Sequence, residues 1–217
     1  SYTVGGVIED VYFDDPAIDR EIRTLLSKDE NAPIYSNELW TIREFAVPVD
    51  AVSCAELSKL PYLERLTALD YQFSSLTFLS SLSEMRELVL TGCRFPAEDL
   101  NIIAGLPSLQ RLTLSDCSLS TISGLENAQN LTYLDLSSNT IRNLEPLSAI
   151  VTLQELYLQH NAMTNLTALG TLSSLQTLNA SYNSLESIAP LATCLKLGWL
   201  DVSNNKLPNL GAVDSLP

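Results

Sequence analysis

Basic residues are scarce in this chain of 217 residues, which has 12 Lys and Arg against 26 Asp and Glu and a formal net charge of −14. A nucleic-acid surface needs clustered Lys and Arg to neutralise phosphates. Docking on an anionic membrane surface needs the same cations. The charge therefore argues against nucleic acid and against an anionic membrane surface as partners.

Long apolar runs and a leader are also missing. No run of about 18 apolar residues occurs, so the sequence predicts no transmembrane helix. The chain opens at Ser1 without an initiator Met and without a basic stretch followed by an apolar one. We therefore expect a signal peptide to be absent from this sequence or already removed.

The scarcity of histidine and cysteine limits the chemistry. One histidine and four cysteines show no zinc spacing, and no D-x-[DN]-x-[DN]-G calcium loop occurs, so we predict no metal and no cofactor. His160 could serve a Ser–His–Asp triad, but no nucleophile elbow or glycine-rich oxyanion loop accompanies it. The sequence therefore predicts no catalytic residue and no enzyme, with His160 exposed at the edge of a sheet.

Leucine, by contrast, is abundant and unevenly distributed, with 38 of the 41 leucines at or after Leu57. They follow the pattern L-x-x-L-x-L-x-x-(N/C)-x-L. In one copy the pattern positions are Leu131, Leu134, Leu136, Asn139 and Ile141. Copies begin at residues 42, 63, 85, 109, 131, 153, 175 and 197, at intervals of 21 to 24 residues. Eight copies at so narrow a period predict a repeat architecture.

Each part of the repeat predicts a structural element. The L-x-L alternation predicts a short strand with its leucines inward, and identical strands stack into one parallel sheet. The ninth position is a ladder residue, whose amide bonds buried backbone groups of its own repeat and of the adjacent one. The ladder positions are Asp50, Tyr71, Cys93, Cys117, Asn139, Asn161, Asn183 and Asn205. Asp50 and Tyr71 depart from the pattern, so we expect irregular turns in the first two repeats.

The first copy of the pattern is the weakest. Its positions are Ile42, Phe45, Val47, Asp50 and Val52.

Cys93 and Cys117 occupy equivalent positions of adjacent repeats, where a disulfide is conceivable. Cysteine also suits a ladder position as a small hydrophobe with a weak donor, and stacking geometry need not suit a bridge, so buried free thiols are our prediction.

Return segments between the strands place apolar residues at every third position, and Pro146 and Pro190 lie among them. This spacing favours 3₁₀ turns or extended segments over a long α-helix. An insertion in the third repeat, residues 95–100, predicts a true helix with Leu100, Ile103 and Ala104 inward.

The N-terminal segment differs in kind. Asp15 before Pro16 suits a helix N-cap and first turn. Helical spacing follows at Ile18, Ile22, Leu25 and Leu26. Because a first repeat exposes an apolar cross-section, solenoids need a polar cap. We therefore predict an N-terminal helical cap over residues 1–41 and a solenoid of about eight repeats over residues 42–217.

These repeats resemble the leucine-rich repeat family from about residue 42 onward. Their 22-residue spacing is similar to that of bacterial internalins and of some eukaryotic phosphatase regulators. Residues 11–26 resemble the F-x-D-P-x-L-x-x-x-I-R-x-x-L cap of bacterial surface leucine-rich repeat proteins, and residues 33–39 resemble its short second helix. The resemblance implies an α/β right-handed solenoid with a parallel sheet on the concave face and 3₁₀ or extended segments on the convex face.

The same resemblance implies a non-enzymatic protein-binding module of an internalin-like bacterial protein that is secreted or displayed on the cell surface. A cytosolic scaffold similar to the phosphatase-regulating relatives is the alternative. A leader encoded upstream of Ser1 would discriminate between the two.

A candidate site follows from the third and fifth positions of each repeat, which face outward and form two columns on the concave sheet. The later repeats place aromatic residues beside carboxylates there, and exposed Tyr and Trp are enriched at interface hot spots. The predicted partner-binding residues are Tyr133, Asp135, Glu155, Tyr157, His160, Asn179, Tyr182, Trp199 and Asp201.

The C-terminal end carries one more expectation. After Leu207 the return segment continues through Leu210, Val213 and Leu216, and the next repeat is due two residues beyond Pro217. An uncovered solenoid end exposes apolar surface and a free strand edge. We therefore expect this chain to be a truncated form or a processed fragment of a native protein that continues beyond Pro217, and, if the fragment is stable alone, we expect its uncapped end to pack against another copy.

Overall fold

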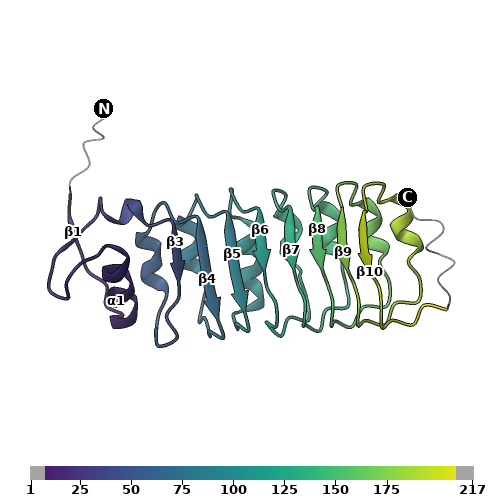
Figure 1. Cartoon of the computed structure of the whole chain (residues 1–217), viewed down its shortest axis with the longest axis horizontal. Coiled ribbons are helices and arrows are strands. Elements are labelled where there is room, and N and C mark those ends of the chain that lie inside the picture. The colour runs from purple at the N-terminus through teal and green to yellow at the C-terminus, as the bar shows by residue number, and fades with distance from the viewer. Residues whose placement is uncertain (1–7, 209–217) are drawn as a thin grey trace, which may run out of the picture.

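The computed structural model describes residues 8–208, in which eight parallel strands form one sheet in chain order (Figure 1). The strands are β3 (Glu44–Ala46), β4 (Arg65–Leu69), β5 (Glu87–Thr91), β6 (Arg111–Thr113), β7 (Tyr133–Asp135), β8 (Glu155–Tyr157), β9 (Thr177–Asn179) and β10 (Trp199–Asp201). Each strand pairs with the next repeat's strand at the equivalent residue. The predicted solenoid with its parallel sheet on the concave face is confirmed.

Short helical turns return the chain on the convex face, as the every-third apolar spacing predicts. The 3₁₀ turns of the repeats are η2 (Ala55–Lys59), η3 (Thr77–Ser81), η4 (Ala97–Asp99), η5 (Leu125–Asn127), η6 (Glu145–Ala149), η7 (Thr167–Thr171) and η8 (Ala189–Thr193). The insertion in the third repeat forms helix α2 (Leu100–Ala104), and Leu100, Ile103 and Ala104 are buried, as predicted.

One continuous hydrophobic core runs between the two faces, from Phe13 to Cys194. The two inward leucines of a strand, such as Leu134 and Leu136, are fully buried. Burying a leucine side chain contributes about 1.5–3 kcal/mol. Because every repeat contributes equivalent side chains, the core extends without a break along the solenoid.

The ladder position of the fifth repeat is Asn139, a buried side chain. Its Nδ2 donates to the carbonyl oxygens of Leu114 and Leu136 at 2.8 and 2.9 Å. Its Oδ1 accepts the N–H groups of Cys117 and Leu119 at 3.1 and 2.9 Å. Equivalent bonds to the preceding and own repeats are made by Asn161, Asn183 and Asn205.

All four cysteines are buried and free, in agreement with the prediction. The thiol of Cys93 donates to the carbonyl of Ala68 at 3.4 Å, and that of Cys117 donates to the carbonyl of Leu90 at 3.2 Å. Burial raises the pKa of the Cys117 thiol to about 12. The thiol therefore stays protonated and acts as a donor.

The first repeat departs from the pattern. Asp50 does not enter the ladder; it is exposed and pairs with Arg20 at 2.9 Å. Val52 is 85% exposed instead of inward. The expected irregular turn of the first repeat is confirmed, whereas the inward position of Val52 is wrong, because this turn bonds to the N-terminal segment. Its backbone N–H groups at Val52 and Ser53 bond the Asp15 carboxylate, at 2.6 and 2.8 Å.

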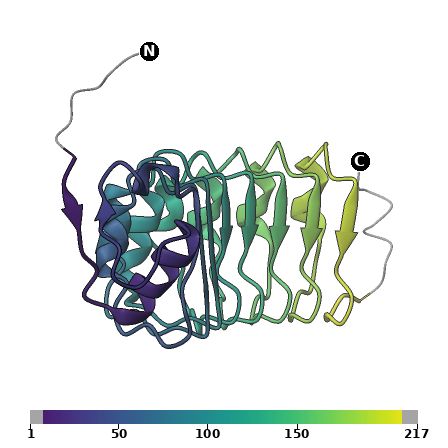
Figure 2. The same cartoon turned by 60° about the vertical axis from the view of Figure 1, so that its left-hand side comes forward.

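Within residues 8–41 the N-terminal segment forms four elements, two of which are short strands that pair antiparallel. The elements are β1 (Asp10–Val11), α1 (Pro16–Leu25), β2 (Ile34–Tyr35) and η1 (Leu39–Thr41). Helix α1 lies at the N-terminal end of the solenoid (Figure 2). Asp15 caps it, since its Oδ1 accepts the N–H groups of Ala17 and Ile18 at 2.9 and 3.1 Å. The predicted N-cap is confirmed.

Of the four residues at helical spacing, Ile18 and Ile22 are fully buried and Leu26 packs against the core, whereas Leu25 is 46% exposed. One expectation for this segment is wrong. The short helix predicted over residues 33–39 is replaced by β2, a turn and η1, because β1 offers this stretch a strand edge to pair with. The division into a cap ending at residue 41 and a solenoid from residue 42 stays a prediction. Residues 1–7, the predicted last return segment through Leu210, and the C-terminal end lie outside the described residues.

Candidate protein-binding face

The parallel register aligns the outward residues of all eight strands in two columns. The third positions are Glu44, Arg65, Glu87, Arg111, Tyr133, Glu155, Thr177 and Trp199. The fifth positions are Ala46, Thr67, Val89, Thr113, Asp135, Tyr157, Asn179 and Asp201. We call this surface the concave face; it presents different chemistry at its two ends.

Ion pairs dominate the N-terminal half of the concave face. Arg65 lies between Glu44 and Glu87, at 3.7 and 3.2 Å, and Arg111 approaches Glu87 at 3.9 Å. Exposed pairs of this kind contribute about 0–1 kcal/mol each to stability. Because two arginines face two glutamates, these four residues together carry no net charge.

Aromatic rings and carboxylates occupy the next two strands. The Arg111 guanidinium lies 3.9 Å from the centre of the Tyr133 ring, and the Tyr133 and Tyr157 rings are 5.5 Å apart. Tyr157 Oη donates to a carboxylate oxygen of Glu155 at 3.3 Å. Both tyrosines are half-buried rather than open, since Arg111 and the ring pair cover them. Burial, and then the charges of Asp135 near Tyr133 and of Glu155 near Tyr157, raise the pKa of both phenols.

The polar residues at the fifth positions stabilise the turns that follow the strands, a role that the sequence analysis did not predict. The side-chain oxygens of Asp135, Asn179 and Asp201 accept the backbone N–H of the serine two residues later, at 2.8, 3.1 and 2.9 Å. Such Asx turns end a strand by satisfying a backbone donor locally. The bond from the Ser203 N–H also lowers the pKa of the Asp201 carboxyl. The recurrent D/N-x-S spacing was the available signal.

His160 and Tyr182 lie on the rim, at the eighth position of their repeats. The backbone is left-handed there, with φ values of 56° and 53°. The same conformation holds the equivalent residues Asp70, Gly92, Asp116, Ser138 and Asn204. The two rings are stacked, with centres 4.3 Å apart. Within residues 8–208 no hydrogen bond joins the His160 ring to a serine or a carboxylate, so the described structure assembles no triad there.

The nine predicted residues thus fall into three groups. Tyr133, Asp135, Glu155 and Tyr157 meet on β7 and β8, and His160 stacks on Tyr182 at the rim. Trp199, 49% exposed, and Asp201 lie on β10 beyond Asn179 of β9. Arg111 completes the first group, and sequence analysis did not single it out.

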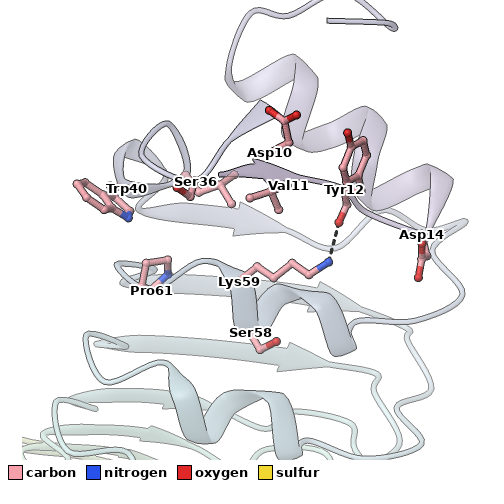
Figure 3. A pocket seen from close by; sticks show the side chains of 10 residues that line it. Asp10, Val11, Tyr12, Asp14, Ser36, Trp40, Ser58, Lys59 and Pro61 are labelled. Carbon is pink, nitrogen blue, oxygen red and sulfur yellow. Dashed lines mark hydrogen bonds between the residues drawn. The ribbon is translucent and has the colours of Figure 1, made fainter. Parts of the chain in front are cut away.

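A separate pocket of about 600 Å³ lies between the N-terminal segment and η2 (Figure 3). Tyr12, Trp40 and Lys59 line it, and Lys59 Nζ donates to the Tyr12 carbonyl at 2.6 Å. Across the described ranges of the chain, no three metal-binding side chains come together. The helices of that same part of the chain are all too short or too polar to cross a membrane.

Comparison with known proteins gives consistent similarities. Residues 107–149 and 151–193 match the family model described as leucine-rich repeats, two copies. Internalin C2 of Listeria monocytogenes is similar in structure, with a TM-score of 0.85 and 29% identity over 94% of this chain and 91% of that chain. No curated protein sequence matches the chain.

Two further solved structures share the fold. An internalin of Listeria monocytogenes, InlF, has a TM-score of 0.73 and 22% identity, covering 99% of this chain and 77% of its own. A leucine-rich repeat protein of Leptospira interrogans has a TM-score of 0.57 and 25% identity, covering 70% of this chain and 46% of its own.

Proposed function

The chain is an internalin-like leucine-rich repeat protein, and on that premise we propose that it is a non-enzymatic module that binds a partner protein on its concave face. One observation carries the proposal: the C-terminal half of that face places aromatic rings beside carboxylates that have no cationic partner. Within residues 8–208 no ion pair involves Asp135, Glu155 or Asp201.

The size of the face supports this assignment. Eight strands at a spacing of about 4.8 Å give a surface on the order of 35 Å long. A standard protein interface needs about 800 Å² per partner. Tyr and Trp supply much of the binding energy at the centres of such interfaces, with charged residues around them. The half of the face from β7 to β10 has that composition.

We further propose that the protein acts outside a bacterial cell, secreted or displayed on its surface. The likeness of residues 11–26 to the cap of bacterial surface proteins supports this location, as does the similarity to internalin C2. Fractionation of the source cells tests it, and recovery from the cytosol alone would contradict it.

Replacing both Tyr157 and Trp199 with alanine should weaken partner binding at least about thirtyfold, because truncating one aromatic anchor of a hot spot costs about 2 kcal/mol or more. Proteins retained on the immobilised wild-type chain supply the partner, and titration calorimetry measures its affinity for each variant.

The matched control removes two exposed aromatic residues from the other end of the molecule. Trp40 and Tyr62 form an edge-to-face pair with ring centres 6.3 Å apart, outside the two columns of the concave face. The Trp40→Ala, Tyr62→Ala variant should bind the partner like the wild type. Unchanged affinity in the Tyr157→Ala, Trp199→Ala variant, or an equal loss in the control, would refute the proposed face.

A further inference from the structure

Four residues at the centre of the concave face form a checkerboard. Tyr133 is directly opposite Glu155 across β7 and β8, and Asp135 is directly opposite Tyr157. The two tyrosines therefore occupy one diagonal, with ring centres 5.5 Å apart, and the two carboxylates occupy the other. We call these four residues the quartet.

The molecule itself shows how such groups hold an arginine. The guanidinium of Arg111 lies over Tyr133 at 3.9 Å while its Nε approaches Glu87 at 3.9 Å. A second case repeats the arrangement at the N-terminal end of the solenoid. There the guanidinium of Arg43 lies over Tyr62 at 5.0 Å and its Nε approaches Glu64 at 3.8 Å.

The second case resembles the quartet in chemistry. Tyr62 and Glu64 are two residues apart just before β4, and Glu155 and Tyr157 have the same separation in the reverse order within β8. In the part of the chain that the structure describes, no arginine or lysine lies over Tyr157. Around Tyr157 the quartet thus has a ring and carboxylates like those of the Arg43 arrangement, with no cation over that ring.

The quartet carboxylates also keep unused acceptor capacity. Asp135 uses Oδ1 for the Ser137 N–H, at 2.8 Å, and Glu155 receives only the long bond from Tyr157 Oη, at 3.3 Å. The remaining carboxylate oxygens have no hydrogen-bond partner in residues 8–208. Arg111 already lies over the Tyr133 ring, whereas no cation within residues 8–208 lies over the Tyr157 ring, so Tyr157 is the ring of the quartet that can still receive one.

We propose that the quartet binds an arginine side chain of the partner protein, with the guanidinium against Tyr157 and its N–H groups donating to Asp135 and Glu155. This inference rests on the proposed function and names the partner chemistry at its centre. Arginine fits better than lysine because a guanidinium is planar, stacks on rings and offers a fork of donors, whereas an ammonium is a compact and strongly hydrated point charge.

Two synthetic peptides test the assignment, identical Gly–Ser sequences with either three arginines or three lysines. Amide chemical shifts of the ¹⁵N-labelled chain report affinity at physiological salt. We expect the arginine peptide to bind at least about fivefold more tightly than the lysine peptide and to shift amides of β7 and β8. Equal affinity of the two peptides would overturn the proposal.

Charge-only variants locate the site. Asp135→Asn keeps the turn, since Asn179 makes the same bond in its own repeat, and Glu155→Gln keeps the side-chain length. Each variant should weaken the arginine peptide at least about threefold. The matched control is Glu145→Gln, which removes an equal charge from exposed Glu145 in the first turn of η6, on the convex face of the same repeat as Asp135, and should change affinity less than about 1.5-fold. An equal effect of Glu145→Gln would show general acidity only and overturn the proposal.

Ring variants at Tyr157 separate stacking from charge. Tyr157→Phe keeps the ring and should retain the preference for arginine, whereas Tyr157→Leu should abolish it; unfolding curves confirm that both variants fold. If the wild-type chain does not prefer the arginine peptide but the Tyr157→Ala, Trp199→Ala variant still loses its partner, the arginine site is refuted and the proposed function is retained. If the wild-type chain prefers the arginine peptide but that variant binds its partner normally, the proposed binding face is refuted.

Discussion

Replacing Asn139 with alanine should lower the free energy of unfolding by about 4 kcal/mol, because its buried amide satisfies several backbone groups at once. Its Nδ2 donates to three carbonyls, two in its own repeat and one in the preceding repeat. Its Oδ1 accepts two N–H groups of the preceding repeat. Each buried group left unpaired costs about 1–3 kcal/mol, and water entering the site reduces the sum.

At Asn139 the ladder residue changes from cysteine to asparagine, which adds an acceptor to the donor. Cys117 in the preceding repeat supplies only a thiol donor, to the Leu90 and Ser115 carbonyls. Asn139 is therefore the first ladder residue with a carbonyl oxygen for its neighbour's turn. Asn139→Cys should cost less than Asn139→Ala, about 2–3 kcal/mol, because the thiol keeps a donor and loses only the acceptor.

Chemical denaturation followed by circular dichroism measures both changes. The matched control is Asn143→Ala in the exposed turn that follows, where the side chain accepts only the Glu145 N–H at 2.9 Å. That substitution should cost below about 1 kcal/mol. Equal losses for Asn139→Ala and Asn143→Ala would mean that the ladder does not hold the repeats together.

The solenoid was predictable because every repeat adopts the same backbone conformation and buries the same positions. Leu134, Leu156 and Leu178, for example, occupy equivalent buried positions. Because the pattern occurs eight times, a chance match in one copy has little effect on the prediction. The same logic placed the outward columns correctly, since residues between inward leucines must face outward.

The N-terminal end was not predictable in the same way. Its contacts join residues that no period relates: the bond from the Val52 N–H to Asp15 spans 37 residues. A strand of two residues, such as β1 or β2, has no alternation to detect. Analogy with the later repeats therefore predicts an inward Val52. In the structure the Val52 backbone N–H donates to the Asp15 carboxylate, and the Val52 side chain is exposed.

The sequence placed the candidate residues on one face of the sheet, but it did not give their contacts. Sequence spacing placed Tyr133 and Tyr157 on one face, yet their ring contact and the cover of Arg111 depend on side-chain conformations. Asp135 likewise accepts the Ser137 N–H, a bond within the turn that stabilises the fold whether or not a partner is bound. The face is therefore a packed surface rather than a row of separate exposed groups, and the quartet carboxylates keep oxygens that have no hydrogen-bond partner within residues 8–208.

Two carboxylates join the N-terminal segment to the first repeat. Asp15 Oδ1 caps helix α1, and its Oδ2 accepts the N–H groups of Val52 and Ser53, at 2.6 and 2.8 Å. In the opposite direction, Glu56 Oε2 of the first repeat accepts the N–H groups of Asp14 and Asp15, at 2.6 and 3.2 Å. The Asp15 carboxylate thus supplies to the first turn the acceptor that an asparagine of the next repeat supplies elsewhere.

Bonding of this kind makes the junction sensitive to pH. Burial would raise the pKa of the Asp15 carboxyl, but four backbone N–H groups outweigh burial and lower that pKa below its ordinary value of 3.8. The pKa of Glu56 is lowered as well, since its bonds to Lys59 and to the backbone outweigh burial. Both carboxylates therefore stabilise the fold fully above their ordinary pKa values, and this stability is lost as the pH falls through the lower pKa values of the folded state.

Asp15→Ala should lower the free energy of unfolding at pH 7 by about 3 kcal/mol, of which about 1 kcal/mol is the lost helix cap. The remainder is the loss of a charged acceptor for two backbone N–H groups of the first repeat, at about 1 kcal/mol or more each. Asp15→Asn should cost less, because its amide oxygen can keep the cap. The matched control is Asp19→Ala, which breaks an ion pair with Arg23 inside one helix and should cost below about 1 kcal/mol.

Unfolding curves from pH 6 to pH 2 complete the test. Wild-type stability should fall across the acid range as Asp15 and Glu56 take up protons, and Asp15→Ala should show a shallower fall because one of the two groups is gone. The difference between the proteins should thus shrink as the pH falls, because protonation of the wild-type carboxylate removes the charge that the variant lacks. A difference that stays constant with pH would mean that the aspartate acts through packing and not through its charge.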